Sequence, residues 1–317
     1  MLPWIGPLQN TFCSGFYYDC DKSGYNFTMK RLLIVGCGDI ALRALPQLAR
    51  NFQVFGLVRA ASQADRIAAL GANPLMGDLD NPATLAALPG VADSVLHLAP
   101  PGESGERDQR SANLIAALAL RPPERLVYIS TSGVYGDCGG AWVDEDRPVA
   151  PQTLRGARRV DAERALLAWG KQNGVAVAVL RVPGIYAAER LPLAQLQRGA
   201  PVLRAEDDVY TNHIHADDLA AICLTTLERG AAGRIYNASD DSEMKMGDYF
   251  DLVADRAGLP RPPRITRAAA EAGAISEGLL SFMRESRRLV NTRMKAELGV
   301  RLRYPSVYEG VPTAVAN

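Results

Sequence analysis

Residues 29–41 read MKRLLIVGCGDIA, an apolar run that ends in the motif GCGDIA at residues 36–41. Such a run, followed by glycines and a helical pattern, predicts a strand, a tight turn and a helix. The first glycine permits the turn, the second lets the backbone approach a pyrophosphate, and the small third residue lets the helix pack on the strand. The motif therefore predicts a dinucleotide site at Gly36, Gly38, Asp39 and Ile40, with the phosphate at the helix N-terminus. A tight turn without a ligand is the alternative.

Apolar runs and helical patterns alternate after this motif. Runs typical of strands lie at residues 53–58, 73–77, 94–98, 125–129 and 175–182. Helical patterns lie at residues 40–50, 63–70, 82–88, 108–120 and 160–172. This alternation predicts βαβ units in a parallel sheet, with right-handed crossovers that put helices on both faces. We therefore expect an α/β protein with a doubly wound parallel sheet, the Rossmann fold.

The composition argues against several classes of function. The 317 residues carry 35 basic and 35 acidic side chains, so no net charge attracts nucleic acid or an anionic membrane. No run reaches the roughly 18 consecutive apolar residues that a membrane helix needs. The five cysteines are scattered and suggest neither a disulfide framework nor a metal-ligand set. We expect a cytoplasmic protein without a metal, monomeric or homodimeric, whose partner is a small molecule.

The end of the second predicted strand bears on the choice of cofactor. An NAD site usually places Asp or Glu there, about 20 residues after the glycines, to bind the ribose 2′-hydroxyl. In this chain Arg59 follows Gly38 by 21 residues. Its guanidinium can pair with a 2′-phosphate, Ser62 can add a hydrogen bond, and Arg66 lies one helical turn further on. The sequence therefore favours NADP over NAD, with a solvated surface arginine as the alternative.

Six further segments resemble the motifs of one enzyme family. They are GDLD at 77–80, HLA at 97–99, STSGVYG at 130–136, RVPGIY at 181–186, NHIHADD at 212–218 and NTRMKAELG at 291–299. In this order they resemble the extended and atypical short-chain dehydrogenase/reductases, the NAD(P)-dependent epimerase/dehydratase family. The resemblance implies cofactor contacts by Asp78 and Leu79 near the adenine, by Leu98, Ala99 and Pro100 beside the nicotinamide ribose, and by Val182 and Pro183 near the carboxamide.

The pair of residues that gives this family its chemistry is replaced in this chain. The family uses Tyr-x-x-x-Lys, in which the lysine lowers the pKa of the tyrosine so that the phenolate can take a proton from the substrate. Alignment on Pro151 and Glu163 puts these two positions at Arg155 and Arg159. Arginine is effectively always protonated, so neither residue can act as a general acid or base near neutral pH.

Other residues could carry the chemistry. The family's upstream hydroxyl, which lies beside the cofactor, is retained as Thr131, and Ser132 is adjacent. Tyr186 is the third catalytic candidate, and Tyr135 is expected at the same carboxyl edge of the sheet, where ligands bind in such folds. His213 could move protons near neutral pH or contact the substrate. Packing or local backbone hydrogen bonds are the alternative for each of these side chains.

Arg155 and Arg159 suggest a different interaction. Two arginines four residues apart on a helix can hold a phosphate or carboxylate, unless they are solvated and paired with Asp161 and Glu163. Residues 261–303 are rich in Arg and Lys, and extended family members bind nucleotide sugars with their C-terminal parts. The substrate is therefore expected to be a small molecule, with a nucleotide sugar as one candidate. Two classes of function remain open: an NADP-dependent oxidoreductase or epimerase-like enzyme with rearranged acid–base groups, and a non-catalytic NADP(H)-binding sensor or regulatory protein.

The chain divides into three expected parts. Residues 1–28 lack helix or strand periodicity and the features of a secretory signal, so we expect a disordered upstream extension with Met29 as the natural start. Residues 29–185 are expected to form the NADP-binding Rossmann domain. Residues 186–317 are expected to form most of the substrate-binding part, with returns to the sheet.

Overall fold

A seven-stranded parallel sheet forms the centre of the computed structural model, which describes residues 16–17 and 28–313. The strand order is β14-β9-β7-β6-β3-β4-β5. The bounds of these strands are β3 Arg31–Val35, β4 Gln53–Val58, β5 Asn73–Met76, β6 Ser94–His97, β7 Arg125–Thr131, β9 Ala176–Val182 and β14 Arg234–Asn237. Every pair of neighbours is parallel, so all seven carboxyl ends lie at one edge. The predicted doubly wound Rossmann fold is confirmed.

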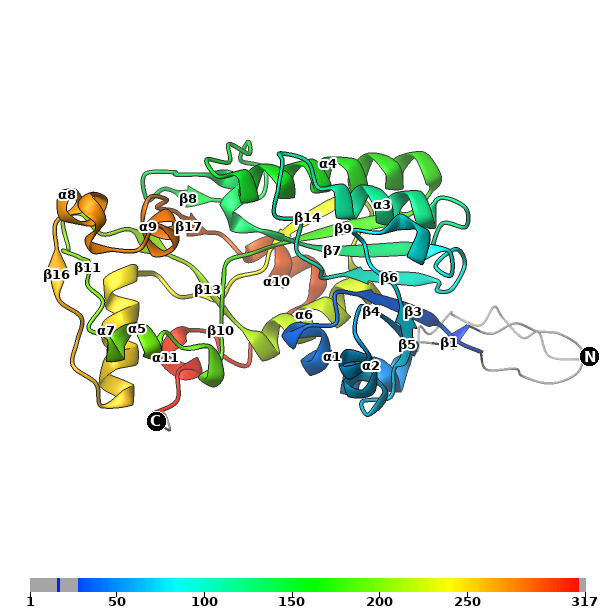
Figure 1. Ribbon diagram of the computed structural model, residues 1–317, viewed down its shortest axis with the longest axis horizontal. Coiled ribbons are helices and arrows are strands. Elements are labelled where there is room, and N and C mark those ends of the chain that lie inside the picture. Colours follow the sequence, from blue (N-terminus) through cyan, green and yellow to red (C-terminus); the bar gives the residue numbers. More distant parts are fainter. Residues whose placement is uncertain (1–15, 18–27, 314–317) are drawn as a thin grey trace, which may run out of the picture.

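Side chains of β3 alternate between the two faces of the sheet. Leu32 and Ile34 pack with α1 (Asp39–Asn51) and α6 (Ala216–Arg229), whereas Leu33 and Val35 belong to a second core beneath other helices. That second face is covered by α3 (Gln109–Leu118) and α4 (Leu154–Asn173), which lie together above the sheet in Figure 1. A strand buried on both sides reads as a continuous apolar run, which explains the RLLIV sequence of β3.

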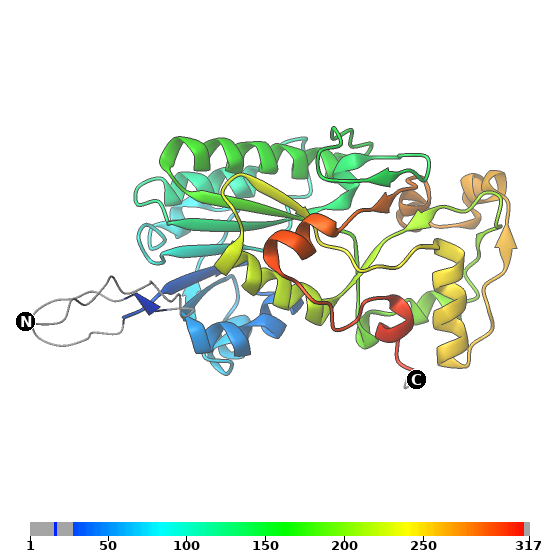
Figure 2. The ribbon, with the colours of Figure 1, turned by 180° about the vertical axis from the view of Figure 1, so that it is seen from behind.

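A smaller lobe lies beyond the carboxyl ends of the strands. Its apolar core is formed by α5 (Leu193–Gln197), α7 (Met246–Ala257), α9 (Glu277–Met283), α11 (Val307–Gly310) and β11 (Val202–Leu203). Seen from behind, the yellow helix α7 and the red helix α11 lie in this lobe (Figure 2). Strand β14 and helix α10 (Thr292–Leu298) come from the same half of the chain but pack on the sheet.

Several predicted element boundaries were wrong, including that of α2, predicted at 63–70 and observed at Ala61–Ala68. Helix α4 begins at Leu154, not near residue 160, because Thr153 caps it by accepting a hydrogen bond from the Gly156 N–H. The pattern at residues 82–88 forms only a short 3-10 helix, Pro82–Leu85. The strand predicted at 125–129 continues to Thr131, where it pairs with Val182. Polar or charged residues hid the start of α4 and the end of β7 from the apolar pattern, whereas the apolar residues 86–88 extended the predicted helix beyond its observed end.

The N-terminal segment is described only in part. Strand β1 (Phe16–Tyr17) pairs antiparallel with β2 (Thr28–Met29). The rest of residues 1–28, on which the predicted disordered extension depends, lies outside the described residues, so that expectation stays a prediction. Within residues 16–17 and 28–313, no helix has the length and apolar character needed to cross a bilayer.

Candidate functional site

The predicted glycine turn joins β3 to α1 at the carboxyl edge of the sheet. Gly36 has φ +97°, and a Cβ atom there would lie 2.4 Å from the backbone nitrogen of Ala99. Gly38 has φ −88°, which any residue can adopt, and a Cβ atom there would meet nothing within 4 Å. The fold itself therefore requires glycine at position 36. At position 38 the absent side chain leaves open space at the N-terminus of α1.

This open space belongs to a pocket of about 230 Å³. The pocket is lined by Val35, Gly36, Cys37, Gly38, Leu57, Arg59, Gln63, Gly77, Asp78, Leu79, Leu98, Ala99, Pro100 and Arg110. Eight of the residues predicted to hold the cofactor are thus brought together from the ends of four strands: Gly36, Gly38, Arg59, Asp78, Leu79, Leu98, Ala99 and Pro100. Gly38 provides no side-chain cap for α1, so the first N–H groups of this helix remain available to an anion.

Two arginines, Arg59 and Arg110, line the pocket, and they differ in their contacts. Arg110 is committed, because it forms an ion pair with Asp80 at 2.6 Å and donates to the Pro100 carbonyl at 3.1 Å. Arg59 is exposed, and among the described residues its guanidinium forms no ion pair. Asp78, half-buried, is the one carboxylate among the lining residues. Ser62 lies exposed in the first turn of α2 (Ala61–Ala68) and is not a lining residue.

Asp39 and Ile40 begin α1, where the phosphate was predicted. Arg43 donates to the Asp39 carboxylate at 3.0 Å and Arg190 donates to it at 2.9 Å. Burial raises the pKa of Asp39, but the hydrogen bonds from Arg190 and Arg43 outweigh this effect and hold the pKa below its usual value. Ile40 is buried in the sheet core. The two arginines thus compensate a carboxylate that would otherwise repel an anion at this helix end.

The hydroxyl candidates lie at the end of β7. Thr131 is half-buried, and its Oγ1 accepts a hydrogen bond from the Gly133 N–H at 3.2 Å. Ser132 is buried. Val182 ends the adjacent strand β9 and is buried, and Pro183 after it is half-buried. The roles predicted for these four residues stay predictions, and Thr131 has the most accessible hydroxyl of the two candidates.

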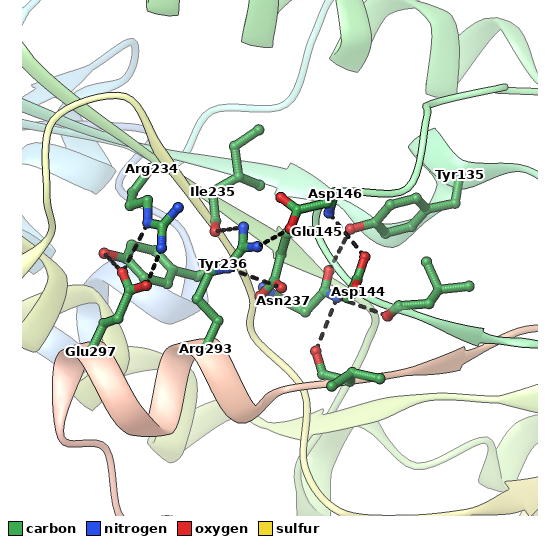
Figure 3. A network of polar contacts seen from close by, with 12 residues as sticks. Tyr135, Asp144, Glu145, Asp146, Arg234, Ile235, Tyr236, Asn237, Arg293 and Glu297 are labelled. Atoms are coloured by element: carbon green, nitrogen blue, oxygen red, sulfur yellow. Dashed lines mark hydrogen bonds and ion pairs between the residues drawn. The ribbon is translucent and has the colours of Figure 1, made fainter.

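Tyr135 is buried with its hydroxyl already engaged. The hydroxyl donates to Asn237 Oδ1 at 2.8 Å, and the Asn237 amide nitrogen donates to the carbonyls of Val143 and Val290, both at 3.1 Å (Figure 3). The Arg181 guanidinium lies 4.8 Å from the centre of the tyrosine ring. Burial raises the pKa of Tyr135 to about 12. These contacts tie the 3-10 helix after β7 (Ser132–Tyr135) to the edge strand β14, and the predicted contact of Tyr135 with a substrate stays a prediction.

Arg155 and Arg159 project differently from the start of α4. Arg159 donates to the Tyr128 hydroxyl at 3.0 Å and to the Ile129 carbonyl at 2.7 Å, so it is bound to β7. Arg155 is exposed and stacks on Phe282, 4.7 Å from the ring centre. Neither forms an ion pair with a described carboxylate, Asp161 and Glu163 included. Arg155 is therefore an uncompensated cation beside the lobe, whereas Arg159 is mainly a structural donor.

Tyr186 and His213 lie side by side under the smaller lobe. The Tyr186 side chain is 2% exposed, its hydroxyl donates to the Ser306 carbonyl at 3.2 Å, and burial raises its pKa. The His213 ring stacks on Tyr249 with centroids 4.3 Å apart, and burial lowers its pKa to about 3. Neither residue lines the pocket at the glycine turn. Their predicted roles stay predictions, and a neutral, packed His213 is a poor proton carrier near pH 7.

One acidic residue near Thr131 was not predicted from the sequence. A Cβ atom built on Gly133 would lie 3.6 Å from Thr131 Oγ1 and 4.0 Å from Glu285 Oε2. Glu285 follows α9, in a segment whose charges follow no strand or helix period. Since 154 positions separate Glu285 from Thr131, no local pattern in the sequence signals that they meet.

The chain resembles known proteins over most of its length. Residues 37–239 match the model of the NAD dependent epimerase/dehydratase family. The chain is 26% identical over 267 residues to a 4-hydroxy-2-methyl-3-oxo-4-farnesyl-3,4-dihydroquinoline-1-oxide ketoreductase from Stigmatella aurantiaca, covering 77% of this chain and 80% of that protein. It is 28% identical over 224 residues to a GDP-6-deoxy-D-mannose reductase from Pseudomonas aeruginosa. The match covers 60% of this chain and 74% of that protein. A solved structure of a conserved protein of unknown function from Silicibacter pomeroyi superposes with a TM-score of 0.72 at 29% identity. The superposition covers 89% of this chain and 96% of that one.

Proposed function

The chain belongs to the NAD-dependent epimerase/dehydratase family, and from this premise we propose that it is an NADP(H)-dependent oxidoreductase acting on a carbonyl or hydroxyl group of a small molecule. The observation that carries the proposal is the pocket at the glycine turn. There the missing side chain of Gly38 leaves room for a pyrophosphate, and Arg59, which forms no ion pair with the described residues, also lines the pocket. Members of this family bind NAD or NADP, and the residues of the pocket fit such a dinucleotide.

Several residues would hold the cofactor. The backbone of residues 36–38 and the first N–H groups of α1 would bind the pyrophosphate. Asp78 and Leu79 would contact the adenine, and the segment from Leu98 to Pro100 would border the nicotinamide ribose. When bound, the cofactor supplies or accepts a hydride. In this proposal the chain's own residues position the substrate and exchange the proton of its oxygen.

Arg59 supports NADP rather than NAD. A guanidinium at the end of β4 can pair with a 2′-phosphate, and it lacks the acceptor oxygens that would bind a free 2′-hydroxyl as an Asp or Glu does. Among the described residues Arg59 forms no ion pair; Asp80, whose pKa its charge helps to lower, is ion-paired with Arg110 instead. Gln63, which accepts from the Arg59 backbone N–H at 3.3 Å, also lines the pocket. The site therefore has a cation free to meet the additional phosphate.

The substrate would meet the carboxyl edge beside Thr131. Thr131 offers a hydroxyl that can hydrogen-bond a carbonyl oxygen, and Ser132, Tyr135, Tyr186 and His213 remain candidates for smaller roles. Arg155 stands where the family has its tyrosine and has no acidic partner among the described residues. An anionic group such as a carboxylate or phosphate would compensate its charge. A nucleotide-linked sugar fits this description, as does a smaller acidic carbonyl compound.

Turnover tests this proposal. We expect the protein to consume NADPH with at least one member of a panel that contains nucleotide-linked keto sugars, acidic aldehydes and quinones. Formation of the corresponding alcohol, identified by mass, would be matched mole for mole to the NADPH lost. Arg155→Ala is expected to raise KM for an anionic substrate while leaving KM for an uncharged one unchanged, because only the anionic one uses the guanidinium.

A non-catalytic NADP(H)-binding role is the second candidate. It is favoured by the state of Arg159, which occupies the family's lysine position but is bound to Tyr128 and Ile129. Such a protein would bind NADPH tightly and leave every member of the panel unreduced. Tight binding without alcohol formation would therefore reject the enzyme and retain the sensor.

A further inference from the structure

Glu285 is held rigidly beside the end of β7. The N–H groups of Cys138 and Gly140 both donate to the Ser286 carbonyl at 3.0 Å, and the Ser286 N–H donates to Asp137 Oδ1 at 2.8 Å. Arg287 donates to the Gly136 carbonyl at 2.7 Å. These hydrogen bonds attach the segment after α9 to the loop that follows β7. They fix the chain directly after Glu285.

The Glu285 carboxylate faces the same gap as Thr131. The position of a Gly133 Cβ atom is 3.6 Å from Thr131 Oγ1 and 4.0 Å from Glu285 Oε2, so both oxygens border the space above this glycine. The side chain of Glu285 is 9% exposed, and Arg287 Nη1 donates to its Oε2 at 2.8 Å. Because residue 133 is glycine, it places no side chain of its own beside Thr131 and Glu285.

We propose that Glu285 exchanges the proton of the substrate oxygen, in place of the tyrosine that this chain lacks. This inference rests on the proposed oxidoreductase function. In reduction, a hydride brings two electrons to the carbonyl carbon, and the protonated Glu285 gives its proton to the oxygen. The products are the alcohol and a Glu285 carboxylate, which takes a new proton from water. In oxidation the carboxylate accepts the hydroxyl proton while the hydride leaves the carbon.

The other candidate groups are less suited to this exchange. Arg155 stays protonated near neutral pH. Tyr186 is engaged with Ser306, and burial raises its pKa. Thr131 can bind the substrate oxygen but gives up its own proton only at high pH. A carboxyl group is the remaining group beside Thr131 that can both donate and accept a proton.

Arg287 acts as a positioning residue for this carboxylate. It bridges Glu285 and the Gly136 carbonyl from a largely buried site, and its Nε atom is buried without a partner among the described residues. The hydrogen bond from Arg287 Nη1 holds the Glu285 carboxylate in one orientation toward the gap. A charge-assisted bond of this kind is short and directional, and it favours the carboxylate, the form that accepts the hydroxyl proton in the oxidation direction.

Glu285→Gln tests the proposal, since the amide keeps the shape and can still accept from Arg287. We expect kcat with the best carbonyl substrate to fall by about 100-fold or more, with NADPH affinity unchanged by calorimetry. Glu285→Asp, which keeps an ionisable carboxyl, should recover part of the activity. Glu277→Gln is the matched control, because Glu277 pairs with Arg284 on the exposed surface of α9.

A second readout does not depend on turnover. We would bind 4-nitrophenol to the protein in the presence of NADP⁺ and follow the yellow phenolate. A neighbouring carboxylate favours the neutral phenol, whereas the amide variant leaves Arg287 to favour the phenolate. We expect the ratio of bound phenolate to phenol to rise about tenfold or more in Glu285→Gln. Glu277→Gln should match the wild type.

The outcomes separate the two proposals. Failure of the wild type to consume NADPH with the whole panel rejects the proposed function, while the nitrophenol ratio still reports on Glu285. The role of Glu285 is overturned if the ratio of bound phenolate to phenol is the same in the wild type and in Glu285→Gln. It is also overturned if neither protein binds the probe. Unchanged kcat in a Glu285→Gln protein that turns over substrate overturns it as well.

Discussion

Gly38→Val is expected to leave the protein folded and to weaken NADPH binding by roughly 100-fold or more, which is about 2.7 kcal/mol. The φ of −88° at this position suits any residue, and the new side chain meets no protein atom within 4 Å of its Cβ. It would instead fill the space at the N-terminus of α1 where a pyrophosphate must lie. The loss of stability should stay near 1 kcal/mol, the usual range for a changed N-cap residue. Calorimetric titration and urea unfolding measure the two effects.

Two other glycines serve as controls for this prediction. Gly36→Ala is expected to lower the free energy of unfolding by about 1–3 kcal/mol or more, because φ is +97° and the Cβ would strike the Ala99 backbone. Gly278→Val lies in α9, where a Cβ also meets nothing within 4 Å, and should leave binding unchanged. Wild-type affinity in a folded Gly38→Val protein would show that no dinucleotide occupies this turn.

Glu163→Ala is expected to lower the free energy of unfolding by about 3–5 kcal/mol. Glu163 and Arg181 form a buried pair at 2.8 Å, with side chains only 4% and 5% exposed, and Ser130 donates a further hydrogen bond to the carboxylate. Removing the carboxylate leaves the Arg181 cation buried without a counter-charge between β7, β9 and α4. Breaking such a pair costs more than the pair contributes, because the remaining charge stays desolvated. Urea unfolding followed by circular dichroism gives the value.

Two variants complete this test. The double variant Glu163→Leu with Arg181→Met should regain much of the loss, because it leaves no charge in the core. Glu124→Ala, which removes an exposed pair with Lys30, should change stability by about 0–1 kcal/mol, since Glu124 is 60% exposed. A loss below 1 kcal/mol for Glu163→Ala would mean that water reaches Arg181 in the folded protein.

The sheet and the cofactor pocket could be predicted from the sequence for a common reason. Strands buried on both faces give continuous apolar runs such as LLIV before Gly36, and the carboxyl ends of parallel strands meet at one edge. Residues that directly follow these runs, such as Arg59, Asp78 and Ala99, therefore converge without any long-range information. Local order along the chain is enough to assemble this pocket.

The substrate side could not be predicted in this way. The sequence predicts that Arg159 holds a substrate anion or pairs with Asp161 and Glu163, but its side chain reaches back to Tyr128 and Ile129 of β7. Tyr186 looked accessible at a strand end, but α11 covers it, and a Cβ on Gly310 would lie within 2.1 Å of its hydroxyl oxygen. Glu285 approaches Thr131 only because its segment is hydrogen-bonded to residues 136–140. These contacts are set by how the smaller lobe folds over the sheet, and no periodic pattern encodes them.

The most direct test of the account is a calorimetric titration of the wild type and of Arg59→Asp with NADPH and with NADH. We expect the wild type to bind NADPH at least about tenfold more tightly than NADH, a difference of about 1.4 kcal/mol from the pairing of Arg59 with the 2′-phosphate. Arg59→Asp should lose this preference or reverse it, because a carboxylate repels the phosphate and accepts hydrogen bonds from a free 2′-hydroxyl. If the wild type binds neither nucleotide, the glycine turn is only part of the scaffold, and the proposed function is contradicted.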